Sequence, residues 1–156
     1  MNLKEIFKST PLFSELIEED FDKLEKHSII VEFEQDEFLF CCRDDADHFY
    51  FILEGQITLQ MFSQQKGAIA LEEIEARHIL GWSWMFAPFK WRFDAFASKK
   101  SKLVVFNAKK FREEMEKDYA FGYRMQRIFM KIMLDRMLIT RQRLLQECGD
   151  NIYLPD

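Results

Sequence analysis

The pattern of hydrophobic and polar positions divides the chain into three parts. Residues 1–27 carry apolar side chains at helical spacing, which Pro11 interrupts. Residues 28–107 contain short runs of aromatic and β-branched residues, spaced about ten residues apart and separated by Asp, Gly and Lys. Helical spacing returns over residues 108–148, first around Phe111 and then from Tyr119 to about Gln146. The pattern predicts a mainly β domain with flanking helices, in which about eight strands form an antiparallel barrel or sandwich.

The long C-terminal helix carries more apolar surface than one domain of this size can cover. One seam repeats at alternating steps of three and four residues, as in a coiled coil: Met130, Met133, Met137, Thr140 and Leu144. Other apolar lines follow Phe121, Met125, Ile128 and Ile132, and Leu134, Leu138 and Leu145. Exposed apolar stripes mark interaction sites, so the seam predicts a homodimer. The alternative is that every line packs on the chain's own barrel. We interpret Arg136, Arg141 and Arg143 as a solvated face.

Composition narrows the class of protein. The chain has 156 residues, of which 48% are hydrophobic and 15% aromatic, so it is long enough for one globular domain with a substantial core. Its net charge of −5 argues against a generally basic surface for nucleic acid. The sequence contains no signal peptide or membrane-spanning run, and its three cysteines form no C-x-x-C motif. We therefore expect a cytoplasmic protein with ordinary thiols and no membrane partner.

Residue patterns for catalysis or metal binding are weak. The three histidines, His27, His48 and His78, fall in separate predicted elements, and no catalytic triad spacing, phosphate loop or H-E-x-x-H motif occurs. These observations predict that the chain is not an enzyme. The acidic run at residues 44–47 beside His48 has the side chains of a metal site, but it also has the composition of an acidic turn. We favour the turn and expect no metal.

The stretch FEQDEFLFCCRDDADHFYFILEGQI, residues 33–57, resembles the cyclic-nucleotide-binding domain of the catabolite activator protein and its relatives. The residues in step with that family's pattern are Asp44, Ala46, Tyr50, Phe51, Ile52 and Gly55. The resemblance implies a double-stranded β-helix, or jelly-roll barrel, followed by a long helix used for dimerisation. It also implies a bacterial regulatory domain in signal transduction. The expected organisation is a helical segment at 1–27, the barrel at 28–107 and C-terminal helices at 108–148.

In responsive relatives, the phosphate-binding cassette begins with Gly-Glu and ends with Arg-Ser/Thr-Ala. The Glu holds the ribose hydroxyl and the Arg pairs with the cyclic phosphate. Here the corresponding residues 81–97, called the cassette segment below, keep Gly81 and Ala95. Trp82 replaces the Glu, while Phe93 and Asp94 replace the Arg and the Ser/Thr. Because a buried anion without a partner is costly, the resemblance implies that a cyclic nucleotide is disfavoured.

Three uses of the cassette segment remain open. It carries six aromatic residues that either fill the barrel or line a remodelled apolar pocket: Trp82, Trp84, Phe86, Phe89, Trp91 and Phe93. In the first case the chain is a protein interaction module. In the second it senses a small molecule anchored by Arg92 or Ser83. The third is a cyclic AMP or cyclic GMP sensor in which Arg92 replaces the missing arginine. The candidate ligand contacts are Gly81, Trp82, Ser83, Trp84, Arg92, Phe93, Asp94 and Ala95. No cofactor is implied.

The sequence after the long helix is short. Only ten residues follow Gln146, whereas a helix-turn-helix needs on the order of 20 residues. We therefore expect no DNA binding of the family's usual kind and a stand-alone regulatory or sensor domain. The sequence identifies neither its ligand nor its partner.

Overall fold

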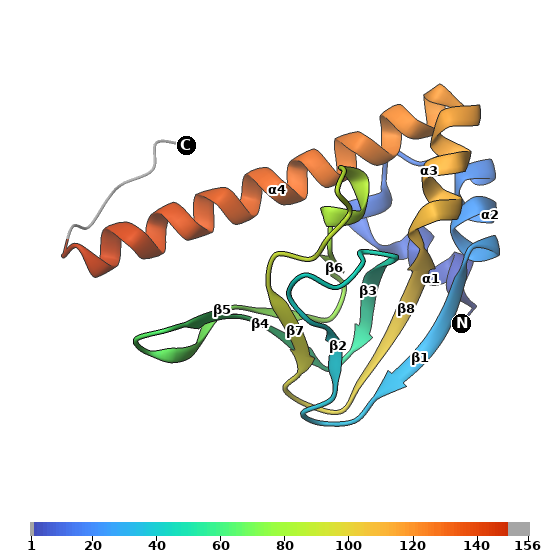
Figure 1. Ribbon diagram of the computed structural model, residues 1–156. Helices are drawn as coiled ribbons and strands as arrows, with labels where there is room; N and C mark the ends of the chain where they lie inside the picture. Colours follow the sequence, from blue (N-terminus) through green and yellow to red (C-terminus); the bar gives the residue numbers. More distant parts are fainter. Residues whose placement is uncertain (1, 150–156) are drawn as a thin grey trace.

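The computed structural model describes residues 2–149 of the chain. The helices are α1 (Leu3–Ser9), η1 (Pro11–Phe13), α2 (Glu18–Lys26), η2 (Ser83–Met85), α3 (Ala108–Lys117) and α4 (Tyr119–Glu147). The strands are β1 (Ser28–Phe33), β2 (Phe38–Phe40), β3 (His48–Glu54), β4 (Gln56–Ser63), β5 (Gly67–Glu75), β6 (Ile79–Leu80), β7 (Asp94–Ala97) and β8 (Ser101–Asn107). Figure 1 shows their arrangement.

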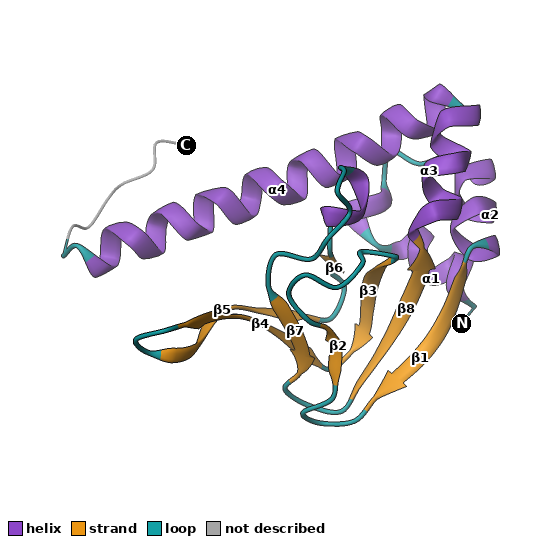
Figure 2. Cartoon of the chain, in the orientation of Figure 1, coloured by secondary structure: helices purple, strands orange, loops and turns teal. Residues whose placement is uncertain are grey.

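The eight described strands form two antiparallel sheets of four strands each (Figure 2). One sheet has the order β1-β8-β3-β6 and the other β2-β7-β4-β5, so strands from distant parts of the sequence lie side by side. This is the jelly-roll arrangement, and the predicted mainly β fold with flanking helices is confirmed. The cassette segment connects β6 to β7, and therefore passes from one sheet to the other.

A column of aromatic rings joins the barrel to the helices. Phe49 of β3 stacks between Trp84 of η2, at 4.7 Å, and Phe106 of β8, at 4.5 Å between ring centres. The rings of Phe111 in α3 and Phe129 in α4 lie edge-on to Phe49, with 4.9 and 5.5 Å between ring centres. All five side chains are fully buried. Offset and edge-on aromatic pairs are attractive as well as apolar, so this column fixes η2, α3 and α4 on the sheet.

The N-terminal helices are tied to the beginning of α4 by a buried ion pair. Asp20 of α2 is 1% exposed, and both of its carboxylate oxygens accept hydrogen bonds from Arg124, at 2.6 and 2.9 Å. This contact raises the pKa of Arg124, because the carboxylate stabilises the charged guanidinium. Lys23 also pairs with Asp118, at 2.8 Å. The N-terminal helices and the beginning of α4 thus form one helical layer.

Helix α4 agrees closely with the predicted range. Its first half is held by buried side chains, among them Phe121, Met125 and Ile128. Its second half extends away from the helical layer, on the same side as the β4–β5 hairpin (Figure 1). Arg143 donates a hydrogen bond to the Leu71 carbonyl of that hairpin. The β4–β5 hairpin and α4 therefore bound a common space.

Within residues 2–149, α4 is the last helix, and none of the helices combines the length and hydrophobicity that a membrane span requires. Residues 150–156 belong to the stretch that the sequence predicts to be too short for a helix-turn-helix. They lie outside the described residues.

Candidate functional site

The cassette segment is pinned to the turn between β2 and β3. The amide of Arg43 donates to the carbonyl of Trp91, at 2.9 Å, and the amide of Trp91 donates to the carbonyl of Asp44, at 3.0 Å. The amide of Ala46 donates to the carbonyl of Phe89, at 2.7 Å. These backbone contacts give the segment a fixed path across the end of the barrel.

Two arginines occupy turns with a left-handed backbone conformation. Arg43 and Arg77 have φ angles of +75° and +70°, in the left-handed region that glycine adopts without strain. Both turns therefore have a backbone conformation that an arginine side chain rarely adopts. Arg77 also donates its amide to the carbonyl of Ile52, at 2.8 Å, which closes the turn before β6.

Gly81, at the beginning of the cassette segment, makes room for an aromatic ring. Its φ of +99° favours glycine, and a Cβ atom there would lie 2.7 Å from the Cη2 atom of Trp91. The Trp91 indole is buried and stacks on Phe40 of β2, with 3.7 Å between ring centres. The space beside Gly81 is therefore occupied by this indole.

The six aromatic residues of the cassette segment do not gather in one place. Trp84 and Trp91 are buried in the core, whereas Phe86 is 65% exposed. Phe89 lies under the guanidinium group of Arg112, 4.2 Å from the ring centre. Only the remaining two, Trp82 and Phe93, line the cavity described next. The segment thus partly fills the barrel and partly borders an open space.

A cavity of about 550 Å³ lies between the cassette segment, the β4–β5 hairpin and α4. It is called the hairpin cavity below. Trp82 and Phe93, at the positions of the expected Glu and Arg, face it from the cassette side. The complete lining is Leu59, Leu71, Glu72, Trp82, Phe93, Met133, Arg136, Met137, Ile139, Thr140, Arg141 and Arg143. Most of these side chains are apolar, and the charged ones come from β5 and α4.

The other predicted ligand contacts lie elsewhere. Ser83 is half-buried in η2, Ala95 is fully buried in β7, and Arg92 is exposed and outside the described lining of the hairpin cavity. Asp94 has a structural role, because its carboxylate accepts the Cys42 amide at 2.7 Å. The structure thus brings together two of the eight predicted residues at this cavity.

Arg136 is the residue that sequence reasoning missed. The prediction of a solvated face is wrong for it, because its side chain is only 11% exposed. Its Nη2 donates to the Ile79 carbonyl at 2.7 Å, and its guanidinium lies 4.9 Å from the Trp82 ring centre. The sequence could have indicated this burial, because position 136 lies four residues after Ile132 and therefore on the same inward-facing line of the helix as Ile128 and Ile132.

Burial and the charge of Glu72 shift the pKa of Arg136 in opposite directions. Burial lowers the pKa of its guanidinium, since a charged group loses solvation inside the protein. Glu72 opposes that shift, with its Oε1 atom 3.8 Å from the Arg136 Nε atom. An arginine side chain does not lose its proton in proteins, so Arg136 remains a cation at the wall of the cavity.

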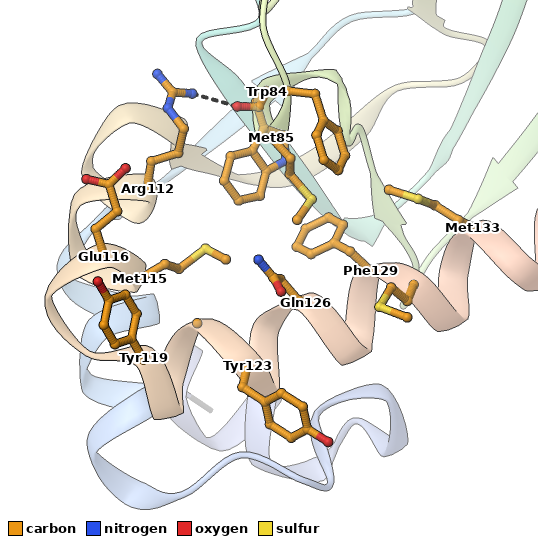
Figure 3. A pocket seen from close by; sticks show the side chains of 13 residues that line it. Trp84, Met85, Arg112, Met115, Glu116, Tyr119, Tyr123, Gln126, Phe129 and Met133 are labelled. Carbon is orange, nitrogen blue, oxygen red and sulfur yellow. Dashed lines mark hydrogen bonds between the residues drawn. The ribbon is translucent and has the colours of Figure 1, made fainter.

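A second apolar hollow, called the methionine groove, lies between η2, α3 and the first half of α4 (Figure 3). It measures about 460 Å³ and contains four methionines: Met85, Met115, Met130 and Met133. Arg112 closes one side by donating a hydrogen bond to the Trp84 carbonyl, at 2.7 Å. Met130 and Met133 also belong to the predicted seam, so the groove and the seam are continuous.

The seam itself is largely uncovered. Met130, Met137 and Leu144 are 65%, 43% and 60% exposed, Thr140 is exposed and Met133 is half-buried. The line through Phe121, Met125 and Ile128 faces the core instead. The domain therefore covers one face of α4 and leaves the heptad-spaced face open to solvent.

The histidines and acidic residues do not form a metal site in the described part of the chain. Among residues 2–149, no three or more His, Cys, Asp or Glu side chains converge as metal ligands. His27 contacts Glu114, with 3.0 Å between Nε2 and Oε1, and this contact lowers the pKa of Glu114.

Comparison with known proteins agrees with the fold. A candidate cyclic nucleotide-binding protein from Geobacter metallireducens GS-15 is 23% identical, with a TM-score of 0.78 over 88% of this chain and 99% of that one. A cyclic nucleotide-binding domain from Methylobacillus flagellatus KT is 18% identical, with a TM-score of 0.80 over 99% and 84%. The N-terminal domain of a transcriptional regulator from Streptomyces coelicolor A3(2) is 18% identical, with a TM-score of 0.68 over 83% and 93%.

Sequence comparison gives the family. No curated protein sequence matches the chain. The family model described as "Cyclic nucleotide-binding domain" matches residues 30–118, which is more than half of the chain and includes the whole cassette segment. The chain therefore belongs to the cyclic nucleotide-binding domain family.

Proposed function

We propose that this chain is a cytoplasmic, non-enzymatic regulatory domain whose hairpin cavity binds a small molecule other than a cyclic nucleotide. The observation that carries the proposal is the lining of the cavity by Trp82 and Phe93. These residues stand where responsive relatives have the Glu and Arg that hold the ribose and the phosphate. An indole and a phenyl ring offer neither an acceptor for the ribose hydroxyl nor a cation for the phosphate, so this wall of the cavity lacks both contacts by which responsive relatives hold a cyclic nucleotide.

The proposed signal is a movement of α4. Met133, Arg136 and Met137 form one wall of the hairpin cavity, so a ligand that fills the cavity contacts the helix directly. A packed helix responds to such a change by shifting or rotating as a unit. The second half of α4 has fewer buried side chains than the first, and is therefore the part that is free to move.

Wild-type protein is expected to give no binding heat with cyclic AMP or cyclic GMP in isothermal titration calorimetry at submillimolar concentrations. The competing function is a nucleotide sensor that uses Arg92, which is exposed in this structure. Micromolar nucleotide binding that Arg92→Ala abolishes would establish that function and refute ours. A matched Lys99→Ala variant removes another exposed cation and controls for general charge loss.

We also infer that α4 forms a homodimer through its seam. Heptad-spaced residues on an exposed helix face fit a second helix of the same spacing, and two copies related by a two-fold axis provide one. Met133, Met137 and Thr140 belong both to the seam and to the wall of the hairpin cavity. A partner copy on the seam would therefore lie close to the ligand, which couples ligand binding to dimerisation.

Met130→Glu is expected to weaken the dimer by at least about 100-fold, since it places a carboxylate in an apolar interface. Sedimentation velocity over a concentration series measures the effect. The monomer fold should survive, because Met130 is already 65% exposed. Gln142→Glu adds the same charge to an exposed position of α4 outside the seam and should leave the dimer intact. A wild-type protein that is monomeric at high concentration would contradict the proposed seam.

A further inference from the structure

The hairpin cavity has a cation at its wall with an unused hydrogen-bond donor. Arg136 donates from Nη2 to the Ile79 carbonyl, and its Nε lies 3.8 Å from Glu72, which is beyond hydrogen-bond distance. Its Nη1 atom is buried and has no hydrogen-bond partner among the described residues. Buried donors are nearly always satisfied, and an unsatisfied donor on a charged group is especially costly.

The charges around the cavity favour an anion. Three arginines line it, Arg136, Arg141 and Arg143, against the single carboxylate of Glu72. All three come from α4, whereas the cassette segment contributes only Trp82 and Phe93. The positive charge therefore lies on the opposite wall from the one that holds the phosphate in responsive relatives.

The rest of the lining favours an apolar ligand body. The remaining side chains are Leu59, Leu71, Trp82, Phe93, Met133, Met137, Ile139 and Thr140, of which only threonine carries a hydroxyl. Apart from the Thr140 hydroxyl and the Trp82 indole N–H, this surface offers no polar partner to the ribose hydroxyls and base edges of a nucleoside. An aryl or alkyl group would bury its surface favourably, and methionine side chains adapt readily to its shape.

We propose that the hairpin cavity binds a small organic carboxylate with an aromatic or aliphatic body, and that Arg136 pairs with its anionic group. This proposal rests on the function proposed above and names the ligand class. A carboxylate is planar and matches a guanidinium group, so it can pair with Arg136 at the cavity wall. The Trp82 ring under the guanidinium holds the cation in place before the ligand arrives.

The test uses matched acids and amides. The probes are 1-naphthaleneacetate and octanoate, each compared with its neutral primary amide, and calorimetry measures their affinity for the full chain. We expect each acid to bind at least about tenfold more tightly than its amide. Arg136→Gln should reduce acid affinity by a similar factor and leave the amides unchanged, and Arg127→Gln removes an exposed arginine of α4 outside the cavity as the control.

The outcomes separate this proposal from the one on which it rests. Equal binding of acid and amide to the wild-type protein would overturn the carboxylate proposal and leave a small-molecule cavity in place. The absence of binding by all four probes would overturn both. Since the acid–amide comparison needs no substitution, the test remains decisive even if Arg136→Gln does not fold. Unchanged acid binding by a folded Arg136→Gln variant would also overturn the assignment.

Discussion

Phe49→Ala is expected to lower the free energy of unfolding by about 4 kcal/mol, the typical cost of deleting a buried aromatic ring. Phe49 is fully buried and contacts rings from η2, β8, α3 and α4, so no single neighbour can move in to fill the cavity. Urea unfolding followed by circular dichroism measures the change. The substitution also removes the ring that both Trp84 of the cassette segment and Phe129 of α4 contact.

Phe62→Ala is the matched control for this experiment. Phe62 lies in the β4–β5 hairpin and is 77% exposed, so the same deletion should change stability by no more than about 0.5 kcal/mol. The loss of stability for Phe49→Leu should fall between those for Phe49→Ala and Phe62→Ala, because leucine keeps much of the apolar volume of the phenylalanine. A loss below about 1 kcal/mol for Phe49→Ala would show that the aromatic column is not the centre of the core.

Asp20→Asn is expected to destabilise the protein by about 3 kcal/mol, because it leaves a poorly solvated Arg124 without its counter-charge. The Asp20 carboxylate is 1% exposed and also accepts the Ile17 amide, at 3.1 Å, at the start of α2. An amide keeps one acceptor oxygen, so both the charge and one of the two hydrogen bonds to Arg124 are lost. Urea unfolding again provides the measurement.

Glu15→Gln provides the comparison, since Glu15 pairs with Arg127 through both oxygens, at 2.9 and 3.2 Å, but is half-exposed. Loss of this pair should lower the free energy of unfolding by no more than about 1 kcal/mol, as for other solvent-screened ion pairs. Similar losses for Asp20→Asn and Glu15→Gln would mean that burial does not distinguish the two pairs. The double variant Asp20→Asn/Arg124→Leu should recover part of the loss, because it removes the unpaired charge.

Helix α4 has different roles on different faces. The line through Phe121 and Met125 anchors it to the core, and the seam through Met130 and Leu144 is open. Between these faces, Arg136 reaches back to the cassette segment and contacts Trp82. The proposed ligand and the proposed partner copy would thus act on the same half of one helix.

The sequence alone determined the fold class and the long helix, and it predicts the loss of the family's phosphate contacts. Strand and helix periodicities are local properties, and so is the replacement of Glu and Arg by Trp82 and Phe93 within one short segment. The family resemblance then followed from residues 33–57, and the match over residues 30–118 confirms it.

The tertiary structure decided which residues surround the hairpin cavity. The contact between Arg136 and Ile79 joins residues 57 positions apart, and the path of α4 over the cassette segment brings them together. Helical periodicity places position 136 on the buried line, but only the packed barrel shows that Trp82 lies beneath it. Likewise, the sequence does not reveal that Trp91 occupies the space beside Gly81, because that depends on how β2 and the cassette segment meet. These contacts join distant segments, so they arise only when the two sheets and α4 pack together.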